Sequence, residues 1–185
     1  MINNKLNISN FFKNLFRYYH SLTIIIFIVI AIFFNSCSIY SFTGTSISPD
    51  IKTVSIQYFN NYAPIIQPTL SQLLTESLKE KFLTQTKLTL VDKDGDLNFK
   101  GSITGYSTSP VAIQANEKAA LNRLSVTISV KFTNNKDDKQ NFETTFTRFE
   151  DYQSNSNFSA IEETLDKQII DALVDDIFNK SVINW

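Results

Sequence analysis

Histidine and cysteine are almost absent from this 185-residue chain, which contains one of each. The histidine is His20 and the cysteine is Cys37, so the region after Cys37 has no imidazole and no thiol. That region therefore excludes a Ser-His-Asp triad, a Cys-His pair, an internal disulfide and a zinc site built from His or Cys. These absences predict a protein that is not an enzyme and that binds no metal ion or other cofactor.

A strong charge of either sign is also missing. The chain has 17 Lys and Arg residues and 18 Asp and Glu residues, which gives a net charge of -1. Residues 1–36 hold three of the basic residues and none of the acidic ones, so the remainder has a net charge of -4. A weakly acidic chain without a basic cluster lacks the electrostatic requirement for binding a phosphate backbone, and we expect no nucleic-acid partner.

The most apolar run in the chain is too short to cross a bilayer. Residues 22–34 contain a single polar residue, Thr23. As a helix this run would extend about 20 Å, whereas the hydrocarbon core is about 30 Å thick. Residues 1–20 precede it with three basic residues and no acidic one. A positive segment followed by a short apolar segment is typical of a secretory signal peptide.

Cys37 follows this apolar run in the tetrapeptide Phe34-Asn35-Ser36-Cys37. The tetrapeptide resembles a bacterial lipobox, where a signal peptidase cleaves before a cysteine that carries diacylglycerol. The usual box has Leu and a small residue at the positions of Phe34 and Asn35. We expect a lipoprotein signal peptide over residues 1–36, with diacylglycerol and an N-linked acyl chain such as palmitate on Cys37. Two or three such chains anchor a protein to a membrane almost permanently.

The segment after the cysteine favours delivery to the outer membrane. Ser38 stands where an Asp would act as an inner-membrane retention signal. Residues 37–50 are rich in Ser and Thr, and we interpret them as a lipidated tether. Residues 51–185 remain for one compact α+β domain, a length that can bury a substantial core.

An acidic cluster, VDKDGDLNF at residues 91–99, has carboxylates at positions 1, 3 and 5 when counted from Asp92, as a calcium-binding EF-hand loop does. That loop requires Gly at position 6 and Glu at position 12. Counted from Asp92, these positions hold Leu97 and Ile103, so the comparison fails. Asp-Gly pairs favour tight turns between antiparallel strands, and the cluster therefore predicts a hairpin turn at Asp94-Gly95.

Hydrophobic periodicity predicts the secondary structure of the domain. Alternating apolar and polar residues predict strands, and apolar residues at steps of three and four predict helices. The expected strands cover residues 51–59, 87–91, 97–104, 121–132 and 142–150, and the expected helices cover residues 69–83 and 160–180. Ser159 and Glu162 have the spacing of a capping box at the start of the second helix.

This order, β-α-β-β-β-β-α, predicts an α+β fold with two helices packed on one face of a four- to five-stranded, mostly antiparallel sheet. The other face of the sheet would carry Lys, Arg, Ser, Thr and Asn. We expect that face to remain open to water or to a large partner.

The sequences YSFTGTSISPDIKTVSIQYFNN at residues 40–61 and PTLSQLLTESLKEKF at residues 68–82 resemble a known family. With the lipobox cysteine, the polar-faced strands and the C-terminal helix, they resemble the LPS-assembly lipoprotein family LptE in its Bacteroidetes-like form. The resemblance implies a non-catalytic outer-membrane lipoprotein that faces the periplasm. It also implies a plug-type complex inside the large β-barrel LptD, where the protein assists barrel assembly and lipopolysaccharide export to the outer leaflet.

Lipopolysaccharide carries phosphates, which Lys and Arg bind through charge-assisted hydrogen bonds. Basic residues on the expected polar strand faces and adjoining loops are candidates for this contact, and the alternative for each is a solvated surface charge. The candidates are Lys100, Lys118, Arg123, Lys131 and Arg148.

Two other functions remain open at this point. One is a periplasmic-facing lipoprotein binding module, or a pilotin for another outer-membrane pore. The other is a lipoprotein enzyme that uses carboxylates, which the spacing of the Asp and Glu residues does not support.

Overall fold

The computed structural model describes residues 47–111 and 120–182 of the chain. Cys37, Lys118, the expected signal peptide and most of the expected tether lie outside the described residues. The described elements, in chain order, are β1 (Thr53–Ile56), β2 (Asn60–Asn61), α2 (Leu70–Gln85), β3 (Thr89–Val91), β4 (Leu97–Pro110), β5 (Leu121–Asn134), the short 3-10 helix η1 (Asp138–Gln140), β6 (Phe142–Gln153) and α3 (Phe158–Val182).

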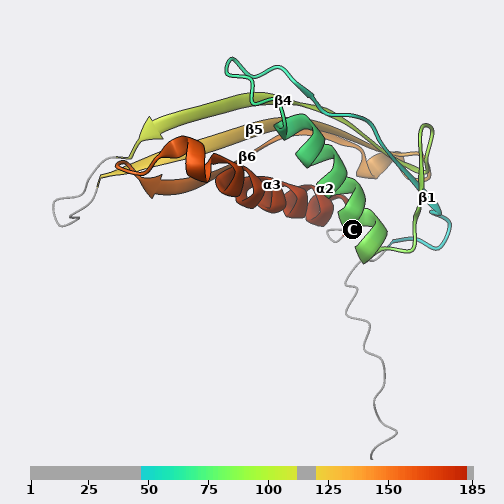
Figure 1. The fold of residues 1–185 in the computed structure, drawn as a ribbon. Coiled ribbons are helices and arrows are strands. Elements are labelled where there is room, and N and C mark those ends of the chain that lie inside the picture. Colours follow the sequence, from blue (N-terminus) through green and yellow to red (C-terminus); the bar gives the residue numbers. More distant parts are fainter. Residues whose placement is uncertain (1–46, 112–119, 183–185) are drawn as a thin grey trace, which may run out of the picture. The chain divides into compact units, whose positions relative to one another are not determined.

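The strands form one six-stranded sheet in the order β3-β1-β4-β5-β6, and β2 also pairs with β4. The pairs β4–β5 and β5–β6 are antiparallel, whereas β1 is parallel to both β3 and β4. Helices α2 and α3 lie on the same side of the sheet (Figure 1). The predicted α+β fold with both helices on one face is confirmed, and the sheet is mixed instead of mostly antiparallel at its β3-β1-β4 side.

The predicted hairpin at Asp94-Gly95 is wrong, because β3 and β4 do not pair with each other. Strand β1 lies between them and pairs with both. Residues 92–96 therefore cross β1 to connect its two neighbours. Asp94 has a φ of 54°, a left-handed conformation that Asp tolerates. A Cβ on Gly95 would lie 2.7 Å from the Ser55 amide nitrogen, so glycine permits the close crossing.

Asp96 fastens this crossover to β1. Its Oδ2 accepts hydrogen bonds from the backbone N–H groups of Lys52 (2.8 Å) and Thr53 (3.0 Å) and from the Thr53 hydroxyl (3.0 Å). The Thr53 Oγ1 in turn accepts from the Asp96 N–H at 2.9 Å. These donors, the Lys52 N–H first, lower the pKa of Asp96 from 3.8 to about 2. The acidic cluster therefore has a structural role.

Strand β5 shows the alternation that the sequence predicts. Its residues Leu124, Val126, Ile128, Val130 and Phe132 are buried on the helix side. Strand β4 continues to Pro110, beyond the predicted end at residue 104. A β-bulge between Ile103 and Gly105 shifts the alternation by one residue, which brings Tyr106 to the buried side. Because the bulge interrupts the alternation of apolar and polar residues, the sequence does not reveal that the strand continues to Pro110.

A chain of aromatic contacts joins the helices to the sheet. The ring centroids of Phe82 on α2 and Phe99 on β4 are 5.0 Å apart, and Phe82 is also 5.0 Å from Phe178 on α3. Phe99 continues to Phe132 on β5 at 4.9 Å, and Phe132 to Phe142 on β6 at 5.1 Å. Such contacts add to the large apolar area that these rings bury. One core therefore holds both helices and three strands together.

The predicted capping box at the second helix is wrong. Helix α3 begins at Phe158, so Ser159 lies inside its first turn. The carboxylate of Glu162 instead accepts a hydrogen bond from Tyr106 on β4, at 2.8 Å. Within residues 47–111 and 120–182, no helix combines the length and the hydropathy that a membrane span requires.

We predict that Gly95→Ala destabilises the domain by about 2 kcal/mol, because its Cβ would overlap the backbone of β1. Gly105→Ala is the matched control, since its Cβ would first meet the Thr127 Cβ at 3.1 Å, a contact that a movement of a few tenths of an ångström relieves. Urea unfolding of both variants measures the difference. A Gly95→Ala variant that is as stable as the wild type would show that the crossover does not require glycine.

Candidate functional site: the open face of the sheet

Hydroxyl side chains cover much of the β4–β5–β6 face that is turned away from the helices. The register places them in rows across the three strands, and the Oγ1 atoms of Thr127 and Thr147 are 3.0 Å apart. We call this surface the open face. Its hydroxyl residues include Ser102, Ser107 and Ser109 on β4, Ser125, Thr127, Ser129 and Thr133 on β5, and Thr145 and Thr147 on β6.

Lys100 and Lys131 lie directly opposite each other at one end of the open face. The Lys131 Nζ is 3.8 Å from Glu143 on β6, a long and exposed ion pair. Lys100 makes no ion pair with any other residue of the described ranges. Like charges opposite each other on a sheet repel, and a bound anion would relieve that repulsion. This pair is therefore the part of the candidate set that is best suited to an anion.

Arg123 lies at the other end of the open face and is already engaged. Its Nε and Nη2 donate to the carboxylate of Asp151 at 2.7 and 2.9 Å. Its guanidinium carbon also stacks 3.6 Å from the centre of the Phe149 ring. The hydrogen bonds from Arg123 lower the pKa of Asp151. Binding a phosphate through Arg123 would require competition with this bidentate ion pair.

Arg148 is not on the open face, contrary to the sequence-based expectation. It lies on the helix side of β6 and donates to Asp176 of α3 at 2.6 Å from Nε and 2.5 Å from Nη2. The parity set by Phe142 and Phe146 places Arg148 on their side of the strand and turns Phe149 outward. Arg148 thus fastens α3 to the sheet edge.

The five candidate residues do not form a single site. Lys100 and Lys131 are neighbours, but Arg123 is eight residues from Lys131 along β5, or roughly 27 Å at strand spacing. Arg148 faces the helices, and Lys118 lies outside the described residues. The contact of any of them with lipopolysaccharide stays a prediction.

A buried polar cluster beneath the sheet was not predicted from the sequence. The Tyr106 hydroxyl lies 2.8 Å from Glu162 Oε1 and 3.1 Å from Asp166 Oδ1. Asp166 is 2% exposed, and burial is the main reason why its pKa is raised from 3.8 to about 6. Burial and the two carboxylates also raise the pKa of Tyr106 far above its usual value. The only sign of this cluster in the sequence is that Asp166 stands beside the apolar stripe of α3.

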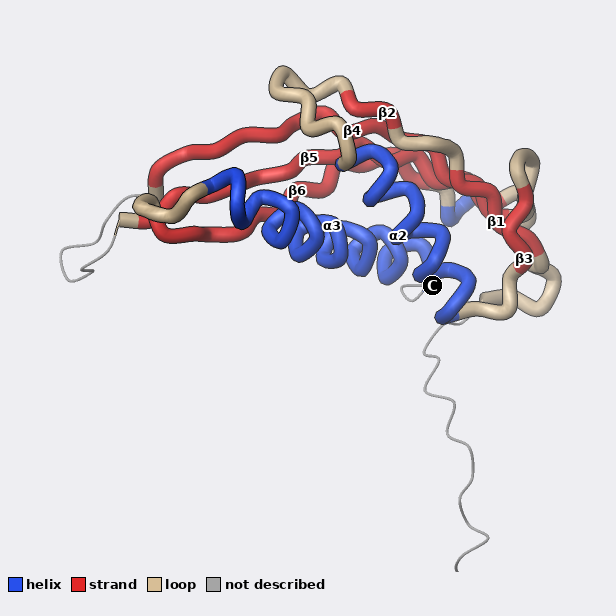
Figure 2. The backbone as a smooth tube through the Cα atoms, in the orientation of Figure 1, coloured by secondary structure: helices blue, strands red, loops and turns tan. Residues whose placement is uncertain are grey.

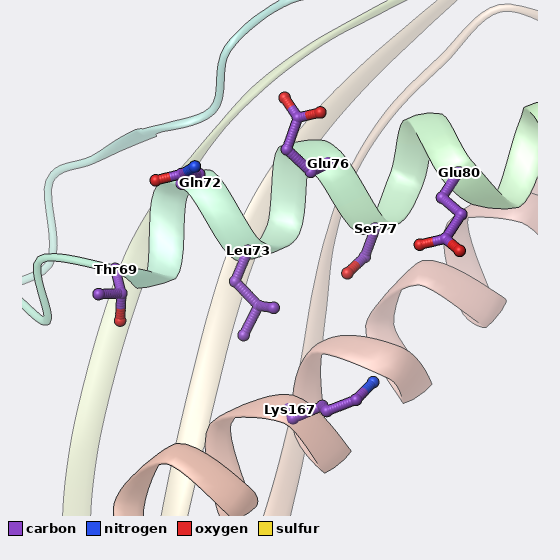
Figure 3. Close-up of a pocket in the computed structure, with 7 residues that line it drawn as sticks. All are labelled: Thr69, Gln72, Leu73, Glu76, Ser77, Glu80 and Lys167. Atoms are coloured by element: carbon purple, nitrogen blue, oxygen red, sulfur yellow. The ribbon is translucent and has the colours of Figure 1, made fainter.

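An open groove of about 400 Å³ runs between α2 and α3. Figure 3 shows Leu73 and Ser77 of α2 pointing toward α3, where Lys167 lies. The Lys167 Nζ is paired with Asp171 at 2.9 Å. Among the described residues, no group of three or more His, Cys, Asp and Glu side chains is arranged to hold a metal ion.

We predict that Asp166→Asn makes the stability of the domain less dependent on pH. Because the folded pKa of about 6 exceeds 3.8, Asp166 does not destabilise the fold below pH 3.8, destabilises it increasingly between pH 3.8 and 6, and destabilises it by a constant amount at higher pH. Asn preserves the size and the acceptor for Tyr106, so the variant should be about 2 kcal/mol more stable than the wild type at pH 7.5.

The measurement is urea unfolding at pH 4, 6 and 7.5, with Asp171→Asn on the exposed side of the same helix as the control. An Asp166→Asn variant that is less stable than the wild type at pH 7.5 would contradict the assignment.

Comparison with known proteins identifies the family of this chain. The model of the family LptE, described as lipopolysaccharide-assembly, matches residues 51–181. No curated protein sequence matches the chain. Similar solved structures include a protein from Xanthomonas campestris, with 14% identity, a TM-score of 0.51, and coverage of 75% of this chain and 91% of that one.

Two further similar structures are lipoproteins by name. A minor lipoprotein from Acinetobacter baumannii has 18% identity and a TM-score of 0.45, with 71% of this chain and 92% of that one covered. The rare lipoprotein B from Shewanella oneidensis has 13% identity and a TM-score of 0.45, with 69% and 92% covered. The family match extends over nearly all of the described domain and confirms the resemblance seen in the sequence. The chain belongs to the LptE family of lipopolysaccharide-assembly proteins.

Proposed function

We propose that this protein is a non-catalytic lipoprotein of the outer membrane that forms a plug-type complex with a large β-barrel of the LptD type. In that complex it assists barrel assembly and the export of lipopolysaccharide to the outer leaflet. The observation that carries the proposal is the family match over residues 51–181. The family match also favours this role over that of a pilotin for another pore.

The open face supports the plug role on physical grounds. The lumen of a large outer-membrane barrel is polar and hydrated. Hydroxyl groups such as those of Thr127 and Thr147 both donate and accept hydrogen bonds. They can therefore replace hydrogen bonds to water by hydrogen bonds to a polar barrel wall at little cost in free energy. A face rich in charges would lose far more hydration free energy in the same contact. Both helices pack against the other side of the sheet and leave this face uncovered by them.

Lipopolysaccharide contact is proposed for Lys100 and Lys131. These two ammonium groups are opposite each other and exposed, so a phosphate would reach both without breaking a bidentate ion pair. Arg123 and Arg148, by contrast, are held by Asp151 and Asp176. The proposal therefore gives the lysine pair a larger part in binding than either arginine.

We predict that changing both Lys100→Gln and Lys131→Gln weakens the binding of lipid A by about tenfold at low ionic strength, since two charge-assisted contacts are lost. Titration of the purified full chain with fluorescent lipid A measures the affinity. Arg148→Gln is the matched control, because it should reduce stability through loss of the Asp176 contact while leaving the affinity unchanged. Unchanged affinity in the double variant would remove the lysine pair from the site.

The lipid anchor is proposed for Cys37. We predict that Cys37→Ala leaves an unprocessed precursor in the inner membrane, because the thiol that accepts the diacylglyceryl group is missing. Membrane fractionation and mass spectrometry of the N-terminus provide the measurement. Ser38→Asp is the companion variant, which should be cleaved and acylated but retained in the inner membrane. A Cys37→Ala protein that is processed and reaches the outer membrane would refute the anchor.

A further inference from the structure

Residues 53–75 contain no Asp, Glu, Lys or Arg, although 19% of the whole chain is charged. This stretch includes β1, β2, the connection to α2 and the first part of that helix. Part of it is buried, which explains the absence of charge there. The connection between β2 and α2 is exposed, however, and burial does not explain its composition.

Large apolar side chains gather on that connection and just before β2. Of the six exposed large hydrophobic residues in the described part of the chain, four lie within residues 58–66, and the other two are Leu83 and Phe149. The four are Tyr58 (55% exposed), Tyr62 (71%), Ile65 (56%) and Ile66 (65%). Figure 2 shows the connection as the tan segment that leads from β2 to the start of α2. We call residues 57–69 the apolar loop.

Hydrogen bonds and buried side chains hold the apolar loop in place, so the exposure of its four large apolar side chains is a feature of the fold. The Tyr62 N–H donates to the Ile103 carbonyl of β4 at 2.8 Å. The Asn61 side chain accepts from the Ala63 N–H at 3.0 Å and donates to the Gln67 carbonyl at 3.2 Å. Phe59 and Ala63 are buried and secure the base of the loop. An organised loop that directs four apolar side chains outward loses little entropy when they are covered.

We propose that the apolar loop rests in the interfacial layer of the membrane to which the protein is anchored. Tyr prefers the level of the lipid headgroups, and Ile prefers the acyl chains beneath them. Charged side chains are costly in the hydrocarbon beneath the headgroups, whereas the rim of a protein interface tolerates them. A loop without any charge on either flank therefore fits a lipid surface better than a protein surface.

The expected anchor would hold the domain near that surface, and this step rests on the proposed acylation of Cys37. The ten residues 38–47 extend at most about 35 Å, so the domain would stay close to the bilayer. A tether of this length gives the loop a high effective concentration at the membrane. The apolar loop consists of residues 57–69 around β2, and the open face belongs to β4, β5 and β6, so the two surfaces consist of different residues.

Depth-dependent quenching tests this proposal on the full chain reconstituted into phosphatidylcholine vesicles, with and without brominated acyl chains. The background is Trp185→Phe, which removes the single native tryptophan. Tyr62→Trp reports on the apolar loop, and Phe149→Trp is the matched control on the open face. We expect a loss of fluorescence in brominated vesicles for Tyr62→Trp and no loss for Phe149→Trp. Equal quenching of both, or of neither, would overturn the proposal.

A second pair of variants checks the chemistry of the contact. Adding Ile65→Asp and Ile66→Asp to the Tyr62→Trp protein should restore its fluorescence, whereas adding Leu83→Asp, at an exposed apolar position outside the loop, should not. Mass spectrometry of the same preparations detects the fatty acid on Cys37 and so tests the anchor separately from the loop contact. Acylated protein without quenching would refute the loop contact alone, and quenching of protein that lacks fatty acid would refute the anchor alone.

Discussion

The structure depends on the register between β5 and its two neighbours. Because side chains alternate along a strand, this register sends Val126, Ile128 and Val130 toward the helices and the intervening hydroxyl residues outward. A slip by one residue would exchange the two faces and expose the core. The aromatic contacts from Phe82 to Phe142 then fix the helices on the apolar side. The open face is thus a direct consequence of the same pairing that builds the core.

The sequence predicted those features that depend on local periodicity. The alternation of β5 and the stripes of α2 and α3 are visible in single segments, and the structure confirms them. The hairpin at Asp94-Gly95 failed because the partner of each strand was β1, which is some forty residues away along the chain. An Asp-Gly pair serves a crossover as well as a hairpin, and only the distant pairing decides between them.

The candidate site, too, was predicted from the sequence only in part. The approximate position of Lys100 and Lys131 on polar strand faces was predicted, but their placement opposite each other follows from register. Arg148 was assigned to the wrong face because Arg commonly points to solvent, whereas the parity of Phe142 and Phe146 takes precedence here. The Tyr106 and Asp166 contact depends on a β-bulge that no periodic pattern contains.

The domain therefore combines a hydroxyl-rich face, a lysine pair at one end of it and an apolar loop. These surfaces suit a protein that occupies and steadies a larger pore, as proposed from membership of the LptE family. Isolation of the full chain from the outer membrane in mild detergent tests this claim most directly. The account predicts a tight one-to-one complex with a large barrel protein. Recovery of the free lipoprotein alone, together with unchanged surface lipopolysaccharide after its depletion, would contradict it.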